Sequence, residues 1–479
     1  MVIITIDSPI IYRIGRVLYM YKIDFDHPCH IYFMGIGGIS MSAFAELLHS
    51  EGFTISGSDM KESKITTHLE SKGIHIFYGQ KASNITSNID LVVYTAAISS
   101  FNPEFVAAKE AGIPMMDRAE MVGQVMANYD TPIAVSGTHG KTTTTSMLSH
   151  IFLSAKKDPT ISVGGILKEI NGNLRIGHSE NFITEACEYT NSFLKFNPKI
   201  SIILNIEADH LDFFKDLDDI RNSFYLFAKR LPQDGALIVN GEIKDYKTLF
   251  SDLSCKVVSY GFDKDSFDYA AENICFNEQG FGEYDLYIEG NFVRHMHLSV
   301  VGIHNISNSL AAIAAAVFAG ISLDDAQDGL DHFQGTDRRF ELKGKIGGVT
   351  IIDDYAHHPT EIAATLNAAK RYPANEVWCV FQPHTYTRTK AFLNEFAETL
   401  SLADHVVLAD IYAAREANPG DISSKDILKL LKDAGVDAYY FPSFDEIENF
   451  LLENCTNGDL LITMGAGDVV TIGEALLGK

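Results

Sequence analysis

The sequence predicts an α/β protein built from three domains. With 479 residues, the chain is too long for a single hydrophobic core. Short apolar, β-prone segments alternate with helical segments through most of the chain, which is typical of sheets covered by helices. Two glycine-rich turns, at residues 35–38 and 137–140, each stand between such a strand and a helix. The expected divisions are an N-terminal extension and lead-in at 1–29, then domains at 30–129, 130–336 and 337–479.

The composition is that of a globular protein with no nucleic-acid or membrane function. Hydrophobic residues make up 46% of the chain and charged residues 21%, and the net charge of −25 argues against binding nucleic acid or an anionic membrane. The six cysteines are scattered without a CxxC pair, so we expect reduced thiols rather than disulfides or a zinc site. No apolar run is long enough to span a bilayer, and we expect a cytoplasmic protein.

The first nineteen residues are apolar but contain Asp7, Pro9, Arg13 and Arg16 and lack a small-residue cleavage site. A signal peptide is therefore not expected. Because the regular pattern begins only after them, we expect Met20 to be the natural start. N-terminal sequencing of the native protein tests this expectation.

Residues 30–59 have the outline of a nucleotide-binding βαβ unit. A strand at 31–34 leads through the glycine turn into a helix at 40–49, a strand at 54–56 and then Asp59. Ser40 stands where the dinucleotide fingerprint has its third glycine. The turn can bind a pyrophosphate, and Asp59 is placed to read a ribose hydroxyl. The alternative for Asp59 is an ordinary turn residue after a strand.

Residues 131–150 have the pattern of a phosphate-binding loop. A strand at 133–135 is followed by the turn SGTHGKT and a helix from residue 143. Glycines allow backbone N–H groups to converge on an anion, Lys141 adds a positive charge, and the Thr142 hydroxyl can ligate Mg²⁺. Only two residues separate Gly137 from Gly140, where the usual pattern has four, so a plain turn before an ordinary helix is the alternative. We interpret the segment as an ATP site.

Further candidate residues follow apolar strands in the central region. Glu185 and His210 each end such a strand, and with Thr142 they can hold one or two Mg²⁺ ions. As a single residue, His210 is more often a capping or core histidine. Asn305 and Asn308 share one face of a helix start, where reading an adenine edge and capping the helix are equally open. Between 234 and 300, short β-prone segments predict an antiparallel annex.

The last third of the chain predicts another α/β unit. Strands are expected at 349–353, 376–381, 404–409 and 460–464, and three of them are followed by polar segments. These segments are DDYAHHP at 353–359, QPHTYTR at 382–388 and GAGD at 465–468. Adjacent histidines without cysteine partners are more often structural than metal-binding.

Taken together, these segments resemble the Mur ligase family of peptidoglycan synthesis, in the branch that adds L-alanine. The resemblance covers the chain from about residue 29 onward and depends on motifs found in this order: GIGGISMS, GTHGKTTTT, EACEY, NIEADHLD, GIHNISNSLAA, GTDRRFE, DDYAHHPTEI, FQPHTYTRT and MGAGD. It implies an N-terminal Rossmann-like domain that binds a UDP-sugar, a central P-loop ATPase-like α/β domain with the antiparallel annex, and a C-terminal Rossmann-like domain that completes the nucleotide and amino-acid sites.

The resemblance also implies the reaction. ATP phosphorylates the carboxylate of UDP-N-acetylmuramate, and the amine of L-alanine attacks the acyl phosphate, releasing ADP and phosphate. Mg²⁺ is the implied metal, and the implied partners are the three substrates alone, with no nucleic acid or membrane insertion, in a monomer or weak homodimer. Catalytic positions carry over to Lys141, His357 and Arg388, and metal ligands to Thr142, Glu185 and His210.

The remaining implied positions are substrate contacts. The ATP site corresponds to Gly137, Thr138, His139, Gly140, Lys141, Thr142, Thr143, Asn305, Asn308, Arg339 and Asp354. The UDP-sugar loop corresponds to Gly37, Gly38, Ser40 and Asp59. Many relatives carry a second arginine where this chain has Thr385. Its absence here leaves Arg388 as the partner for the incoming carboxylate.

Three other functions remain as alternatives. A recycling ligase that attaches a preformed peptide to the same sugar nucleotide shares most of the motifs. An NAD(P)-dependent oxidoreductase built on GIGGIS has no use for GTHGKTT. The third is a non-catalytic ATP-gated binding protein, which measurable amide formation would exclude.

Overall fold

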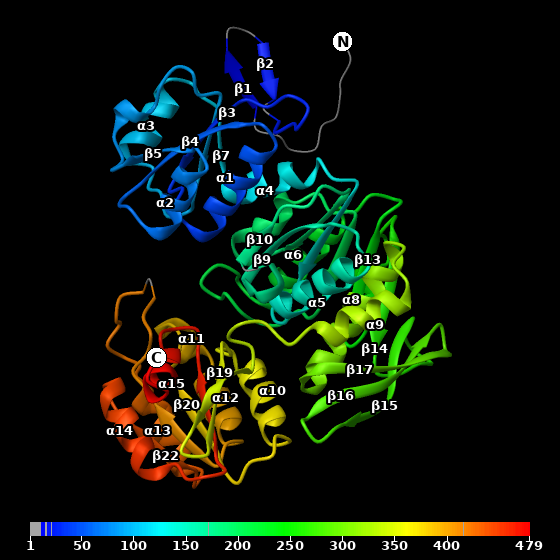
Figure 1. Cartoon of the computed structure of the whole chain (residues 1–479), viewed down its shortest axis with the longest axis vertical. Coiled ribbons are helices and arrows are strands. Elements are labelled where there is room, and N and C mark those ends of the chain that lie inside the picture. The colour runs from blue at the N-terminus through cyan, green and yellow to red at the C-terminus, as the bar shows by residue number, and fades with distance from the viewer. Residues whose placement is uncertain (1–10, 15–16, 21, 171, 415) are drawn as a thin grey trace.

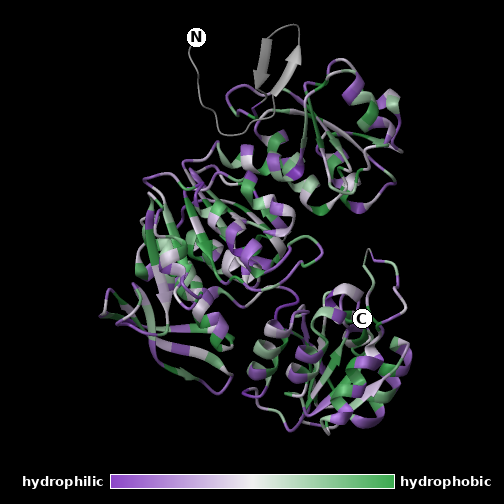
Figure 2. Ribbon diagram, turned by 180° about the vertical axis from the view of Figure 1, so that it is seen from behind, coloured by the Kyte–Doolittle hydropathy of each residue, from purple (hydrophilic) through white to green (hydrophobic). Residues whose placement is uncertain are grey.

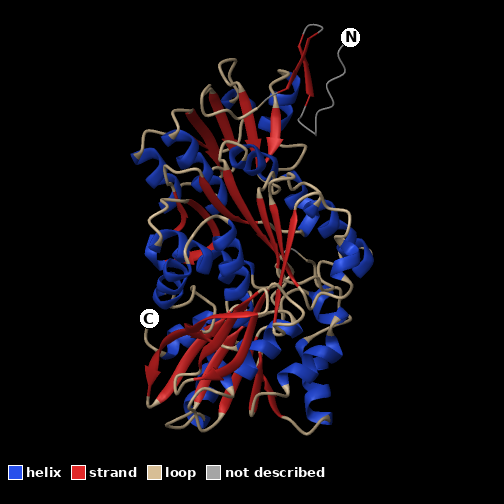
Figure 3. Cartoon of the chain, turned by 90° about the vertical axis from the view of Figure 1, so that its right-hand side faces the viewer, coloured by secondary structure: helices blue, strands red, loops and turns tan. Residues whose placement is uncertain are grey.

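The computed structural model describes residues 11–14, 17–20, 22–170, 172–414 and 416–479. Three α/β units follow one another along the long axis of the molecule, each with its own sheet flanked by helices (Figures 1 and 3). The predicted α/β fold class with three domains is confirmed. Within the described residues, no helix is long and apolar enough to cross a membrane.

A two-stranded antiparallel sheet precedes the first unit, formed by β1 (Ile11–Ile14) and β2 (Val17–Met20). The expectation that Met20 is the natural start concerns a segment in which residues 1–10, 15 and 16 lie outside the described residues.

The first unit is a five-stranded, fully parallel sheet in the order β5-β4-β3-β6-β7. Parallel strands covered on both faces read as apolar runs, and Tyr32, Phe33 and Met34 of the central strand are completely buried. The strands are β3 (His30–Met34), β4 (Thr54–Asp59), β5 (His75–Tyr78), β6 (Leu91–Tyr94) and β7 (Met115–Asp117), and the helices are α1 (Ile39–Ser50), α2 (Lys64–Ser71), η1 (Ala82–Asn84), α3 (Pro103–Glu110) and α4 (Arg118–Met126).

The central unit is one ten-stranded sheet in the order β10-β9-β11-β8-β12-β13-β14-β15-β16-β17. Its strands are β8 (Thr131–Ser136), β9 (Thr160–Leu167), β10 (Gly172–Arg175), β11 (Asn181–Glu185), β12 (Ile200–Ile203), β13 (Ala236–Asn240), β14 (Lys256–Gly261), β15 (Tyr269–Phe276), β16 (Phe281–Ile288) and β17 (Asn291–Val301). Its helices are α5 (Lys141–Ser154), η2 (Lys168–Ile170), η3 (Tyr189–Lys195), α6 (Leu217–Ala228), α7 (Tyr246–Leu249), α8 (Ile303–Phe318) and α9 (Leu323–His332).

The structure corrects the predicted extent of the antiparallel annex. It begins at β15, not at residue 234, because β13 and β14 pair in parallel with the main sheet. The annex strands β15 to β17 continue this same sheet through β14. Two helices also start earlier than expected: α5 begins at Lys141 and α8 at Ile303, so Lys141 and Asn305 are both helical.

The first and central units meet where α4 packs against η3. A Cβ atom added at Gly123 would overlap the carbonyl oxygen of Lys195, so only glycine permits this approach. Asn197 Nδ2 donates to Gly123 O at 3.3 Å, and Lys195 forms an ion pair with Asp117. The contact fixes the first unit next to the central sheet.

We expect Gly123→Ala to lower the melting temperature by several degrees, because the backbones must separate to admit the methyl group. Differential scanning calorimetry checks this. Gly73→Ala is the control for replacing a glycine where a Cβ meets nothing within 4 Å. Because Gly73 has a φ of +91°, alanine there also strains the backbone. A Gly123→Ala protein as stable as the wild type would contradict the tight contact.

The third unit is a six-stranded sheet in the order β18-β19-β23-β20-β21-β22, parallel except for the edge strand β18. The sequence did not predict the edge strands β18 and β22. The strands are β18 (Glu341–Ile346), β19 (Val349–Asp354), β20 (Val377–Phe381), β21 (His405–Leu408), β22 (Asp437–Tyr440) and β23 (Leu460–Met464), and the helices are α10 (Pro359–Ala369), α11 (Tyr386–Ala391), α12 (Leu393–Leu400), α13 (Ser424–Asp433), α14 (Phe444–Asn454) and α15 (Val470–Leu476). In all three units, the strands that helices cover are mainly apolar, and the helices carry polar residues on their outer faces (Figure 2).

At the far end of this third sheet, the His405 ring stacks on Trp378 with ring centroids 3.9 Å apart. Its Nδ1 lies 2.6 Å from Asp437 Oδ2 and its Nε2 lies 3.0 Å from Glu376 Oε2. Burial alone lowers the pKa of His405, but the two carboxylates outweigh it, and the pKa is raised.

Because the folded-state pKa of His405 is raised, its charged pairs stabilise the protein fully below the unfolded pKa. That contribution is lost as the pH rises through the folded pKa. We therefore expect the gap in melting temperature between wild type and His405→Gln to be larger at pH 6 than at pH 9. Thermal unfolding at both pH values checks this, and a gap that widens with rising pH would contradict it.

Candidate active site

The phosphate loop lies between β8 and α5, at the carboxyl edge of the central sheet. Strands β11 and β12 flank β8, so the segments after all three strands meet at this edge. Gly137 and Gly140 have φ values of +143° and +83°. A Cβ at Gly140 would lie 2.9 Å from Asn308 Oδ1, which shows how closely α8 approaches the loop.

Lys141 forms a buried ion pair that the sequence did not predict. Its Nζ lies 3.0 Å from Glu188 Oε2 and donates to the carbonyl oxygens of Gly137 and Thr138 at 2.5 and 3.2 Å. Glu188 is only 2% exposed. Burial alone lowers the pKa of Lys141, but the charge of Glu188 outweighs it, so the pKa is raised and the lysine is charged. The lysine is thus held at the loop by groups that a phosphate can replace.

The three predicted metal ligands lie around this lysine. Glu185 Oε1 accepts a hydrogen bond from Gly164 N at 2.6 Å, and Thr142 contacts the neighbouring Gly165. His210 has a left-handed φ of 53°, and its Nε2 lies 3.7 Å from Glu188 Oε1. A hydroxyl and a carboxylate beside a phosphate loop suit Mg²⁺, and the imidazole is the less usual donor. The residues therefore fit the ion, with Glu188 as a further carboxylate.

A cavity of about 560 Å³ opens beside the loop, between the central and C-terminal units. Seven of the predicted ATP-site residues line it: His139, Gly140, Thr143, Asn305, Asn308, Arg339 and Asp354. Its apolar wall comes from the annex strands, the residue after α9 and the C-terminal unit. The residues are Phe281, Val300, Val301, Phe333, Phe340, Leu342, Ile352 and Tyr372. A concave site that combines an apolar wall with polar side chains able to form hydrogen bonds suits a nucleotide.

The two asparagines contact each other at the start of α8. Asn308 Nδ2 donates to Asn305 Oδ1 at 3.1 Å, and Asn305 Nδ2 donates to Val301 O at 2.8 Å. Both are buried and both line the cavity. The neighbouring His304 also lines it, and burial lowers its pKa to about 4, so it is neutral. Sequence reasoning missed His304, although the residue lies within the quoted GIHNISN segment.

Asp354 and Arg339 belong to the C-terminal unit and reach the cavity from the opposite side. Asp354 accepts hydrogen bonds from the backbone N–H groups of Phe340 and Ala356 at 2.8 and 2.7 Å. Burial raises its pKa to about 6, against the lowering effect of Arg339. Arg339 Nη1 lies 3.6 Å from Glu361 Oε1. Both units are therefore needed to enclose the cavity.

Arg388 and His357 of the C-terminal unit form a part of the site that does not line the cavity. Arg388 Nη2 donates to Asp209 Oδ1 at 2.9 Å, and Nη1 lies 3.0 Å from His384 Nδ1. Asp209 belongs to the segment after β12, so this ion pair joins the central and C-terminal units. The rings of His357 and His384 are 5.7 Å apart. Burial lowers the pKa of His357 and of His384 to about 4, so both are neutral. A recess of about 30 Å³ lies beside Arg388 and Asp209.

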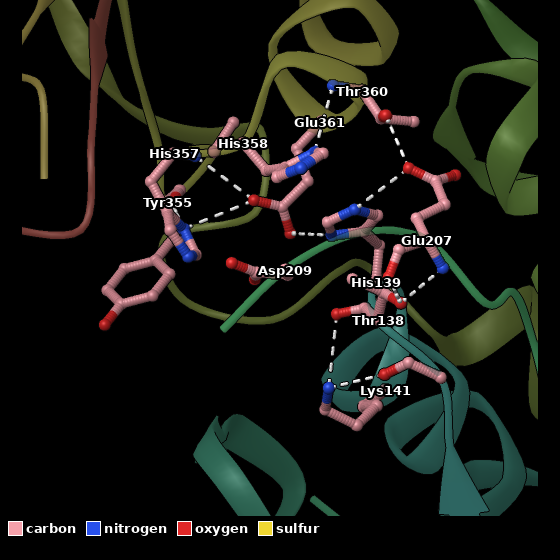
Figure 4. Close-up of polar contacts among 12 residues, drawn as sticks. Thr138, His139, Lys141, Glu207, Asp209, Tyr355, His357, His358, Thr360 and Glu361 are labelled. Atoms are coloured by element: carbon pink, nitrogen blue, oxygen red, sulfur yellow. Dashed lines mark hydrogen bonds and ion pairs between the residues drawn. The ribbon is translucent and has the colours of Figure 1, made fainter. Parts of the chain in front are cut away.

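His139 of the phosphate loop lies between two carboxylates, as Figure 4 shows. Its Nε2 is 3.4 Å from Glu207 Oε2, and its Nδ1 is 3.4 Å from Glu361 Oε1. Among the described residues, His139, Glu207 and His358 form a group of potential metal ligands within 4.8 Å, which is not the predicted set. The sequence did not single out Glu207, Asp209 or Glu361, although all three lie inside quoted motifs.

The predicted UDP-sugar residues form a separate loop in the first unit. Gly37 N donates to Asp59 Oδ2 at 2.8 Å, so Asp59, the last residue of β4, supports the glycine turn. Ser40 Oγ accepts from Arg118 Nη1 at 3.0 Å, and Gly38 caps α1. Among the described residues, no hydrogen bond or ion pair joins this loop to the phosphate loop.

Comparisons with known proteins agree with this geometry. Residues 30–130 match the description "Mur ligase family, catalytic domain", residues 135–316 match "Mur ligase middle domain", and residues 338–467 match "Mur ligase, glutamate ligase domain". The chain is 63% identical to a UDP-N-acetylmuramate–L-alanine ligase of Agathobacter rectalis, over 96% of this chain and all of that protein. It is 52% identical to the protein of the same name from Clostridium botulinum, over 93% and 96% of the two chains.

Two solved structures share the architecture. A UDP-N-acetylmuramate–alanine ligase from Thermotoga maritima superposes with a TM-score of 0.76 at 30% identity, covering 94% of this chain and 98% of that one. A murein peptide ligase from Psychrobacter arcticus gives a TM-score of 0.67 at 25% identity, with the same coverage. The three matched domains and the full-length relatives agree, and the chain belongs to the Mur ligase family.

Proposed function

We propose that this protein joins L-alanine to the carboxylate of UDP-N-acetylmuramate, with ATP converted to ADP and phosphate, in peptidoglycan precursor synthesis. The observation that carries the proposal is the 63% identity, over the whole relative, to a protein named for this reaction. The alternative, a ligase that attaches a preformed peptide, corresponds to a structure at only 25% identity.

The site geometry supports an acyl-phosphate route. The cavity takes the adenosine of ATP, with its phosphates toward the loop at 137–143 and toward Lys141. A carboxylate oxygen of the sugar attacks the γ-phosphorus, and the bond from that phosphorus to the β-γ bridging oxygen breaks, which releases ADP. The alanine nitrogen, as the free amine, then attacks the acyl carbon. Phosphate leaves with the electrons of its C–O bond, and the nitrogen releases one proton to give the neutral amide. Lys141 stabilises the negative charge that gathers where two anions meet.

We assign the metal site to Thr142, Glu185 and His210, with Glu188 close to it. A Mg²⁺ ion held there supplies positive charge to the phosphates. Chelation with EDTA is expected to abolish turnover, and excess Mg²⁺ to restore it. Undiminished turnover in EDTA would contradict this assignment.

The other substrate positions are proposals of the same kind. We place the diphosphate of the UDP-sugar at Gly37, Gly38 and Ser40, with Asp59 supporting the turn. We place L-alanine near His357 and Arg388.

The domain limits 30–129, 130–336 and 337–479 are kept as proposals, since each range contains one complete sheet. The use of ATP and a nucleotide sugar favours a cytoplasmic reaction, and a monomer or weak homodimer stays a prediction.

The decisive experiment measures ADP release and amide formation with UDP-N-acetylmuramate and ATP. L-Alanine, glycine, L-serine and the tripeptide of the recycling reaction are compared at equal concentration. L-Alanine is expected to give the highest kcat/KM. If the tripeptide supports turnover and L-alanine does not, the peptide-adding alternative is correct.

A further inference from the structure

We propose that Glu361 is a positioning residue that joins the phosphate loop to the amino-acid end of the site. Its carboxylate is shared by His139 of the loop and His357 of the C-terminal unit (Figure 4). This inference rests on the proposed function. It assigns a role to a residue that the sequence motifs did not single out.

Each oxygen of Glu361 serves a different part of the site. Oε1 lies 3.4 Å from His139 Nδ1 and 3.6 Å from Arg339 Nη1. Oε2 lies 3.2 Å from His357 Nδ1 and accepts the backbone N–H of His357 at 3.1 Å. The side chain of Glu361 is only 11% exposed, so water competes little for these contacts. One carboxylate therefore contacts ATP-side and alanine-side residues together.

His139 depends on both units for its position. Glu207, which follows β12, holds its Nε2, and Glu361 of α10 holds its Nδ1. Thr360 Oγ1 donates to the same Glu207 oxygen at 2.6 Å, which adds a second link between the units. Burial alone lowers the pKa of His139, but Glu361 and Glu207 raise it to about 9, so the ring is an imidazolium. The His358 ring, 4.5 Å away, is the other titratable neighbour.

Glu361 and the carbonyl group of Tyr355 together fix the tautomer of His357. The two groups nearest to His357 Nδ1 are acceptors: Glu361 Oε2 and the carbonyl oxygen of Tyr355, which is 3.0 Å away. Nδ1 must therefore carry the proton, because a neutral imidazole has one donor and one acceptor nitrogen. Nε2 keeps its lone pair on a ring that packs beside His384, the partner of Arg388. His357 is thus prepared to accept a hydrogen bond or a proton at the alanine end.

If Glu361 had a purely structural role, Glu361→Gln would leave the kinetics unchanged. Glu361 lies in the first turn of α10, where an acidic residue favours the helix and accepts the N–H of His357. Glutamine can keep that hydrogen bond and nearly the same volume. His139 and His357 face different oxygens of Glu361, however, and glutamine has an NH2 group in place of one oxygen, which cannot accept from a histidine N–H. Glu361→Gln therefore separates the two roles.

The test compares Glu361→Gln with Glu207→Gln, which removes a charge beside His139 and leaves the contact between Glu361 and His357 in place. Glu361→Gln is expected to lower kcat/KM about tenfold or more for both ATP and L-alanine. Glu207→Gln is expected to lower it for ATP and to leave the KM for L-alanine within about twofold. Glu361→Asp keeps both acceptor oxygens and should show smaller losses for both substrates. Unchanged kinetics in Glu361→Gln, or a loss confined to one substrate, would overturn the proposal.

A substrate-free measurement keeps this test independent of the ligase activity. In ¹⁵N-histidine-labelled full-length protein, NMR is expected to show His139 doubly protonated and His357 as the Nδ1–H tautomer at pH 7. Signals of both residues should change in Glu361→Gln, but only the His139 signal in Glu207→Gln. An unchanged His357 signal in Glu361→Gln overturns the inference. Failure of the wild type to form an amide would overturn the proposed function instead.

Discussion

Lys141→Ala is expected to lower turnover by about a thousandfold or more, because it removes the positive charge that faces the phosphates. Lys141 Nζ donates to carbonyl oxygens of the loop itself, so the lysine lies at the proposed phosphate site. Steady-state ADP release with UDP-N-acetylmuramate and L-alanine measures the effect. Near-normal turnover in the variant would exclude the assigned role.

The same substitution is also expected to destabilise the protein. The sequence pattern places Lys141 in the turn SGTHGKT, before the predicted helix. In the structure it is the first residue of α5 and neutralises the buried Glu188. Breaking one partner of a buried ion pair typically costs about 3–5 kcal/mol, since the other charge stays buried without a partner.

The double variant Lys141→Ala/Glu188→Gln separates the two effects. It removes the stranded carboxylate, so it should recover most of the lost free energy of unfolding while turnover stays absent. Thermal unfolding and ADP release, measured on the wild type, the single variant and the double variant, check both parts. A single variant as stable as the wild type would show that Glu188 finds another partner.

The parts of the site that the sequence predicted are local. The glycine turn, Lys141 and Thr142 follow one another within seven residues, and the chemistry of a strand, turn and helix fixes their relative positions. The alternation of strands and helices likewise predicted three sheets, because each element carries its own apolar pattern. The extent of the annex was misjudged, since parallel and antiparallel strands have similar composition and differ only in pairing.

The parts that the sequence did not predict are long-range. Glu188 follows the end of β11 and caps η3, and no residue pattern indicates that it pairs with Lys141. Glu361 meets His139 across more than 200 residues, and only the packing of the C-terminal unit on the central sheet brings them together. Two charged residues that pair across domains lie far apart in the sequence, so no motif spacing within either domain reveals the pair.

Arg388→Ala is expected to raise the KM for L-alanine by about tenfold or more, and the KM for ATP much less. A guanidinium contributes a charge-assisted, bidentate contact to a carboxylate, and Arg388 lines the recess near which we place L-alanine. Initial rates with each substrate varied in turn measure both constants. An equal rise in both would count against placing the alanine carboxylate here.

The structure adds a competing explanation that the experiment must exclude. Arg388 already pairs with Asp209, and although burial alone raises the pKa of Asp209, Arg388 and His210 hold it well below its usual range. Arg388→Ala therefore also leaves a buried negative charge that repels the alanine carboxylate. The double variant Arg388→Ala/Asp209→Asn removes that charge. If the KM for alanine stays high in the double variant, Arg388 binds the carboxylate directly; if it returns to normal, Arg388 serves only to neutralise Asp209.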